Sequence, residues 1–122
     1  MGDKVTSWGY AGADVDALQV YDDVFVPRLF NPWADLLLDA VGVDPGEELL
    51  DDACGPGTVA RLAAVRLGAS GQVTACDVSP GMLAVAAAKP PLIDAAPITY
   101  VECPAGALQV EGASFDVVVC QQ

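Results

Sequence analysis

The 122-residue chain contains no histidine, so the commonest general base and the commonest metal ligand are both absent from it. Positive charge is also scarce: five Lys and Arg stand against 17 Asp and Glu, a formal net charge of −12. Proteins that bind a phosphate backbone or an anionic membrane surface use clustered Lys and Arg side chains. Here the basic residues are scattered, so neither nucleic acid nor membrane is an expected partner.

No apolar run approaches the roughly 20 residues of a membrane span, and the N-terminus does not have the form of a signal peptide. The four cysteines, at positions 54, 76, 103 and 120, show no C-x-x-C spacing and are too sparse for a disulfide scaffold. We therefore expect a cytoplasmic protein with reduced thiols. The composition, 53% apolar and 18% charged, excludes intrinsic disorder and fits a single folded domain.

Residues 1–46 are expected to form an N-terminal helical segment that covers the rest of the chain as a lid. Apolar residues recur at helical spacing from Val15 to Phe30, and Pro27 predicts the end of that helix. Asn31 is a suitable N-cap for a second helix, which Gly42 ends. The apolar side chains of this second helix share one face: Trp33, Leu36, Leu37 and Ala40.

Residues 47–122 alternate between predicted strands and helices. Strands are expected from Leu49 into the glycine-rich turn, at 72–76, at 98–101 and at 115–120, with helices after Gly57 and after Ser79. This alternation predicts an α/β fold whose parallel strands are joined by right-handed crossovers. The strands are almost continuously apolar, as expected when helices cover both faces of the sheet.

One stretch carries a chemical signal. The first predicted strand leads into a glycine-rich turn at residues 53–57, and a helix follows at once. Such a turn lets a ligand approach the backbone closely, and the helix N-terminus offers unpaired N–H groups. Asp77 lies at the end of the next strand, where a carboxylate can accept hydrogen bonds from both ribose hydroxyls of an adenosine. Together the two features predict an adenosine cofactor.

The spacing of Gly55, Gly57 and Ala60 fits the dinucleotide pattern G-x-G-x-x-A, which leaves a nicotinamide-dependent oxidoreductase as an alternative. The residues around the turn resemble another family more closely, the class I S-adenosylmethionine-dependent methyltransferases. Three stretches carry the resemblance, in order: Leu49-Leu50-Asp51-Asp52-Ala53-Cys54-Gly55-Pro56-Gly57-Thr58, then Thr74-Ala75-Cys76-Asp77-Val78-Ser79-Pro80-Gly81-Met82-Leu83, then Ser114-Phe115-Asp116-Val117-Val118-Val119. The resemblance covers about residues 47–122.

The resemblance implies a Rossmann-like sheet of order 3-2-1-4 and S-adenosyl-L-methionine as cofactor, with S-adenosyl-L-homocysteine as product. It implies that the turn packs against the methionine moiety, that Asp51 orients the turn and the amino group, and that Asp77 holds the ribose diol. It further implies apolar contacts of Val78 and Met82 with adenine and a backbone contact from Ala105. Cys120 would face the sulfonium or the acceptor. The residues implied in the turn are Ala53, Cys54, Gly55 and Gly57.

Two positions depart from the family pattern. Asp52 replaces a strand hydrophobe, and a buried charge costs several kcal/mol unless it is paired or solvated. Pro104 replaces an acid that receives the adenine amino group. The family sheet has seven strands, whereas this chain ends after its fourth, so we expect a fragment. Its exposed fourth-strand edge would then recruit a second copy or a companion chain.

Several residues also have plain structural interpretations. Met82 serves equally well as core filler on an amphipathic helix, and Asp116 as a solvated strand residue. Trp8, Tyr10 and Tyr21 either form a lid over the cofactor or cover an apolar face. The four cysteines all fall near the predicted strand ends; with no histidine and no close pair, we expect them to line a crevice rather than bind a metal.

The sequence therefore predicts the cofactor-binding portion of a methyltransferase that acts on a small molecule. It offers no credible general base. The main alternative is a non-catalytic module that binds an adenosine ligand or completes the sheet of another chain.

Overall fold

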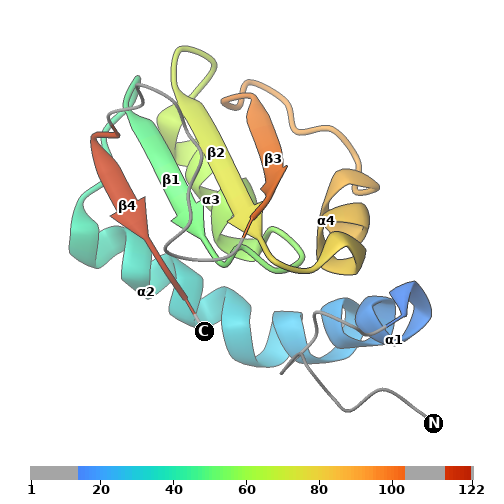
Figure 1. Ribbon diagram of the computed structural model, residues 1–122. Helices are drawn as coiled ribbons and strands as arrows, with labels where there is room; N and C mark the ends of the chain where they lie inside the picture. Colours follow the sequence, from blue (N-terminus) through green and yellow to red (C-terminus); the bar gives the residue numbers. More distant parts are fainter. Residues whose placement is uncertain (1–13, 104–114, 122) are drawn as a thin grey trace, which may run out of the picture.

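A computed structural model describes residues 14–103 and 115–121 of the chain. Four parallel strands form one sheet in the order β3-β2-β1-β4, as predicted (Figure 1). The strands are β1 Glu48–Asp52, β2 Gln72–Asp77, β3 Ile98–Glu102 and β4 Val117–Val119. Strand β4 is shorter than the sequence suggests, because Phe115 and Cys120 lie outside the paired residues.

The β1–β2 and β2–β3 crossovers each contain a helix at the expected position. Helix α3, Thr58–Leu67, joins β1 to β2 and ends at Gly68. Helix α4, Pro80–Ala87, joins β2 to β3, and the Ser79 hydroxyl caps its N-terminus by accepting a hydrogen bond from the Met82 N–H at 3.1 Å. The N-cap prediction at Ser79 is confirmed.

The N-terminal helices differ from the prediction. Helix α1, Val15–Val20, continues without a break into the π-helix η1, Tyr21–Phe30, and then into α2, Asn31–Val41. Pro27 therefore does not end the helix, and Asn31 has helical dihedrals (φ −58°, ψ −48°) rather than those of an N-cap. The wider turn explains the difference: the Asn31 N–H bonds the Val26 carbonyl five residues back, and a π turn accommodates the missing N–H of proline. The predicted end at Gly42 is confirmed, with φ +70°.

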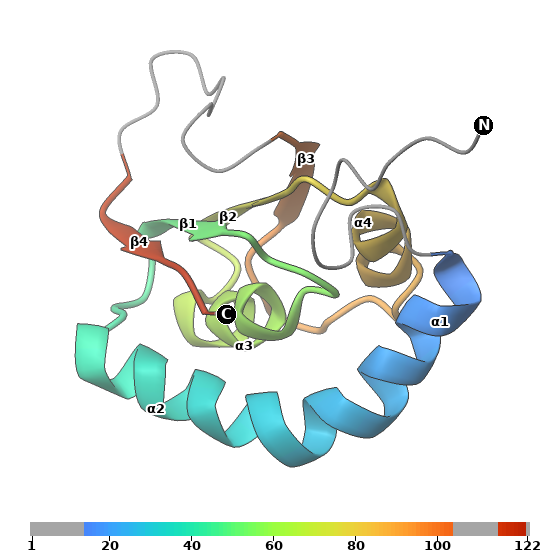
Figure 2. The ribbon, with the colours of Figure 1, turned by 60° about the horizontal axis from the view of Figure 1, so that its bottom comes forward.

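The main core lies between the sheet and the helices that cover one of its faces. Leu38 of α2 and Ala63 of α3 are fully buried there against Leu49 and Val73 of the strands. Figure 2 shows α2 and α3 together on this side of the sheet. The N-terminal helices thus share the core of residues 47–122 rather than packing by themselves.

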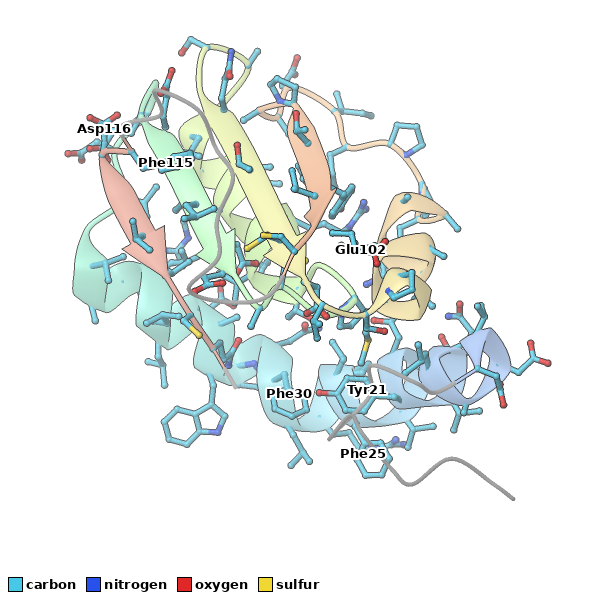
Figure 3. All side chains as sticks on the ribbon, viewed as in Figure 1. Tyr21, Phe25, Phe30, Glu102, Phe115 and Asp116 are labelled. Atoms are coloured by element: carbon cyan, nitrogen blue, oxygen red, sulfur yellow. The ribbon has the colours of Figure 1, made fainter. Side chains whose placement is uncertain are left out.

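The other face of the sheet carries a smaller apolar cluster around Leu50, Cys76 and Cys103, with Phe115 packed against it (Figure 3). Within residues 14–103 and 115–121, no helix contributes to this cluster. This cluster therefore consists of strand and loop residues. In the same part of the chain, no helix has the length and apolar character needed to cross a bilayer.

Helix α2 buries a narrower face than its sequence suggests. Its buried residues are Ala34 and Leu38, one turn apart against α3. Trp33 and Leu36, which the sequence places on one apolar face, are 63% and 56% exposed. Trp33 and Leu36 thus lie on one side of the helix, but no other described residue buries them.

Candidate functional site

The glycine-rich turn lies at the carboxyl end of β1, the edge of the sheet where α/β folds bind ligands. Three of its residues have left-handed backbones: Ala53 (φ +60°), Gly55 (φ +55°) and Gly57 (φ +87°). The Cys54 N–H donates to the Cys76 carbonyl at 2.8 Å, and the Gly57 N–H donates to the Cys54 carbonyl at 3.0 Å. The turn is therefore tied to the end of β2 as well as to β1.

Asp77 joins the two loops of this edge. Its Oδ2 accepts a hydrogen bond from the Gly55 N–H at 2.8 Å, and its Oδ1 accepts one from the Ser79 N–H at 2.8 Å. Bonds to an ionised carboxylate are among the strong ones. Each oxygen keeps a lone pair, so the carboxylate that shapes both loops can still accept hydrogen bonds from a ligand. The sequence prediction placed Asp77 at this strand end, and the structure brings it to the turn.

Asp51 is the most deeply buried acid of the described residues, with 1% of its surface exposed. Burial, together with the charges of Asp52 and Asp77, raises its pKa from 3.8 to about 7, against a hydrogen bond from the Ala60 N–H that favours the charged form. Its Oδ2 is buried and has no hydrogen-bond partner. A positive charge placed near the turn would favour the charged form of Asp51.

Of the remaining predicted site residues that the structure describes, Val78 and Cys120 are exposed and Met82 is buried. Val78 follows Asp77 and is 51% exposed, free to contact a flat apolar group. Met82 is 3% exposed and packs with Leu18 of α1 and Val85, so its core role is evident. Cys120 is exposed just beyond β4. Ala105 and Pro104 lie outside the described residues, as do Trp8 and Tyr10.

The four cysteines gather at the carboxyl edge of the sheet, as predicted. Cys54, Cys76 and Cys103 are buried. Burial raises the pKa of Cys54 well above its usual range and that of Cys76 to about 12, so both thiols stay protonated near neutral pH. The described residues contain no group of three or more His, Cys, Asp or Glu able to hold a metal ion. These thiols have the character of apolar lining.

Asp52, the charged departure from the family pattern, is half-buried on the face opposite the helices. The Cys76 thiol donates to its Oδ1 at 3.2 Å. The carboxylate is thus both partly solvated and partnered, which explains how the strand tolerates it. Asp116, whose solvated position the sequence favoured, accepts a hydrogen bond from the Glu48 N–H at 2.8 Å at the opposite edge of the sheet, far from the turn (Figure 3).

Helix η1 passes below the carboxyl ends of the strands (Figures 1 and 3). Its aromatic rings form a cluster, with the Tyr21 ring centroid 6.0 Å from Phe25 and 5.6 Å from Phe30. Tyr21 also packs against the small core around Met82. The chain beyond β4 returns to this helix, because the Gln121 amide donates to the Phe30 carbonyl at 3.3 Å.

Sequence reasoning missed Tyr100 of β3. Its side chain lies so close to the turn that a Cβ on Gly57 would come within 3.2 Å of its Oη. The only sequence signal is alternation along β3, which places Ile98 and Tyr100 on the helix-covered face. That pattern alone does not tell which residue lies under the turn.

The comparisons with known proteins agree with this geometry. A family model described as a methyltransferase domain matches residues 49–122. The chain is 41% identical over 70 residues to the nocamycin O-methyltransferase of Saccharothrix syringae, covering 57% of this chain and 25% of that protein. It is 32% identical over 100 residues to the ubiquinone/menaquinone biosynthesis C-methyltransferase UbiE of Xylella fastidiosa, covering 80% of this chain and 39% of that protein.

Among solved structures, a S-adenosylmethionine-dependent methyltransferase from Aquifex aeolicus matches with a TM-score of 0.69 at 20% identity, over 88% of this chain and 56% of that one. This likeness shows the fold. The chain spans between a quarter and two fifths of the curated relatives described above. The domain model covers more than half of the chain and includes the glycine turn and Asp77. The chain therefore belongs to the class I S-adenosylmethionine-dependent methyltransferases, with their Rossmann-like fold.

Proposed function

We propose that this chain is the cofactor-binding portion of a methyltransferase that acts on a small molecule. The observation that carries the proposal is the Asp77 carboxylate, which holds the glycine turn and the start of α4 at hydrogen-bond distance on one sheet edge. The cofactor is S-adenosyl-L-methionine. The two curated relatives are named for methylation in nocamycin and in ubiquinone or menaquinone biosynthesis, which supports a small acceptor. The net charge of −12 argues against a nucleic-acid acceptor.

The residues present fit such a cofactor. Asp77 has lone pairs for the ribose diol, and Val78 offers an exposed apolar side chain next to it for adenine. The turn of residues 53–57 would lie against the methionine moiety, and the charge of Asp51, whose Oδ2 has no hydrogen-bond partner, would favour the cationic amino group. The sulfonium methyl of the cofactor is an activated electrophile, so alignment of the acceptor supplies much of the rate. A cytoplasmic location is also proposed, because four widely spaced cysteines are too sparse for a disulfide scaffold.

The test is calorimetric titration of the chain with S-adenosyl-L-homocysteine and, in parallel, with NAD. Binding of the first and not of the second is the expected result, since the turn and Asp77 are shared by both cofactor classes but the surrounding residues match the methyltransferase motif. Binding of NAD alone would contradict the proposal. Methyl transfer tested with and without the remaining part of a methyltransferase domain separates an enzyme from a non-catalytic binding module.

We further propose that a companion polypeptide carrying a further strand pairs with β4. In the sheet of the described residues β4 is an edge strand, and Val118 is 59% exposed on it. Next to it lies an apolar groove of about 650 Å³ between η1, α2 and the end of β4. Its lining residues are Leu29, Phe30, Trp33, Leu36, Leu37, Cys120 and Gln121. A strand added to β4 would place side chains over this groove.

Without that companion, we expect the chain to associate with itself through the same surface. Sedimentation velocity at high protein concentration should show a dimer or larger species, because apolar groove and strand edge are exposed together. Leu36→Glu should shift the species to monomer. Val20→Glu is the matched control, because Val20 is also 56% exposed but lies on α1, outside the groove. If the wild-type chain stayed monomeric at high concentration, the proposed association through the β4 edge and the groove would be contradicted.

A further inference from the structure

Tyr100 lies beneath the glycine turn rather than in it. It belongs to β3, where it pairs in register with Ala75 of β2 on the helix-covered face of the sheet. Its side chain packs against the main core. Although β3 is two strands away from β1 in the sheet, the long phenol reaches back to the loop that follows β1.

The contact with the turn is close. A Cβ built on Gly57 would lie 3.2 Å from Tyr100 Oη, 3.8 Å from Tyr100 Cε1 and 3.3 Å from Ala86 Cβ of α4. The end of the turn, immediately before helix α3, therefore lies against the tip of the phenol, its hydroxyl first and the ring edge next, and against Ala86 of α4. Gly57 also has a left-handed backbone, at φ +87°, so a side chain at this position would be strained and would press against the phenol and Ala86.

The electrostatic surroundings of the phenol agree with this position. Burial raises the pKa of Tyr100, the nearby Cys54 and Asp51 raise it further, and Arg61 lowers it. Cys54 is in the turn, Asp51 ends the buried part of β1, and Arg61 is in the first turns of α3. The hydroxyl thus lies among the three segments that shape the proposed cofactor site, and it is neutral there.

We propose that Tyr100 is a positioning residue for the cofactor site, acting through Gly57 without touching the cofactor. Its side chain is the support that fixes the turn, and with it the hydrogen bonds that the N–H groups of Cys54, Gly55 and Gly57 donate within this edge of the sheet. This inference rests on the proposed function, because positioning matters only if the turn binds the cofactor.

The experiment compares Tyr100→Ala, Tyr100→Leu and Tyr100→Phe with Ile98→Ala. Ile98 is the matched control, since it lies on the same strand and face, packs against the same core and does not contact Gly57. Amide hydrogen exchange at Cys54, Gly55 and Gly57 is measured in the ligand-free chain, and affinity for S-adenosyl-L-homocysteine is measured by calorimetry. Thermal stability is recorded for each variant.

Loss of the ring should accelerate exchange at these three amides and weaken binding by about tenfold, a change of about 1.4 kcal/mol. Tyr100→Phe keeps the ring but removes Oη, the atom nearest to Gly57, so its two values should lie between those of wild type and Tyr100→Leu. Ile98→Ala should lower thermal stability but leave the turn amides and the affinity unchanged. If Tyr100→Ala does not fold, Tyr100→Leu, which keeps an apolar side chain of moderate size, gives the same comparison.

Unchanged exchange in the Tyr100 variants would overturn the proposal, as would equal effects of Tyr100→Leu and Ile98→Ala on the turn. Failure of the wild-type chain to bind S-adenosyl-L-homocysteine would instead contradict the proposed function. The exchange data would still show whether Tyr100 holds the turn in place, because they are collected without ligand.

Discussion

Replacing Asp77 by alanine should weaken binding of S-adenosyl-L-homocysteine by at least about 100-fold, measured by calorimetry. The substitution removes two hydrogen bonds at once, from the N–H groups of Gly55 and Ser79, both 2.8 Å long. A hydrogen bond to a charged group contributes about 1.5–3 kcal/mol, and 100-fold in affinity corresponds to about 2.7 kcal/mol. The same substitution takes away the proposed acceptor for the ribose hydroxyls, so both the turn and the ligand should be held less firmly.

A matched control comes from Asp116→Ala. Asp116 also accepts a backbone N–H, from Glu48 at 2.8 Å, but at the opposite edge of the sheet. Any loss of affinity that both variants share reflects general destabilisation of the sheet. If Asp77→Ala bound S-adenosyl-L-homocysteine as tightly as wild type, Asp77 would not be the ribose ligand. If Asp116→Ala lost as much affinity as Asp77→Ala, the loss would not be specific to the proposed site.

The turn and Asp77 could be predicted from sequence because their geometry is local. A strand, a glycine turn and a helix follow one another without interruption, and the acid ends the next strand along the chain. The parallel register of β1 with β2, with Asp52 opposite Cys76, then brings the acid to the turn. The strand order 3-2-1-4 came from the resemblance to the family, and the structure confirms it.

The predictions that failed, and the residues that were missed, depend on non-local or irregular geometry. Pro27 normally ends an α-helix, but the π turn around it keeps the helix continuous to Val41. Trp33 and Leu36 lie on an apolar stripe that nothing in the described residues covers. Tyr100 contacts Gly57 only because of how β3 lies behind the turn, which alternation along the strand does not specify.

The stability of the chain should fall as pH rises from about 4 to about 7, and Asp51→Asn should remove this dependence. Asp51 has its pKa raised from 3.8 to about 7 in the fold, mainly by burial. Between these two values the folded state holds a proton that the unfolded state has lost, so raising the pH favours unfolding. At 1.36 kcal/mol per pKa unit, the full effect above pH 7 is about 4 kcal/mol.

Urea denaturation at pH 5 and pH 8 measures the effect. The free energy of unfolding of Asp51→Asn relative to wild type should increase by about 2–3 kcal/mol between the two pH values, because wild type bears only part of the penalty at pH 5. Asp52→Asn removes one of the two charges that raise the pKa of Asp51, so it should move the transition to lower pH. A constant difference between wild type and Asp51→Asn across this range would contradict the raised pKa.

Burying the charged form of Asp51 lowers the stability of the fold, and binding of the cofactor offers a reason for keeping this acid. The cationic amino group of the cofactor would favour the charged form of Asp51, whose Oδ2 has no other hydrogen-bond partner. Affinity for S-adenosyl-L-homocysteine should therefore rise between pH 6 and pH 8 in wild type and stay flat in Asp51→Asn. If the affinity of both proteins changed with pH in the same way, Asp51 would have only a structural role, through the hydrogen bond that it accepts from the Ala60 N–H of α3. A rise confined to wild type would mean that the stability lost by burying this carboxylate is recovered on binding.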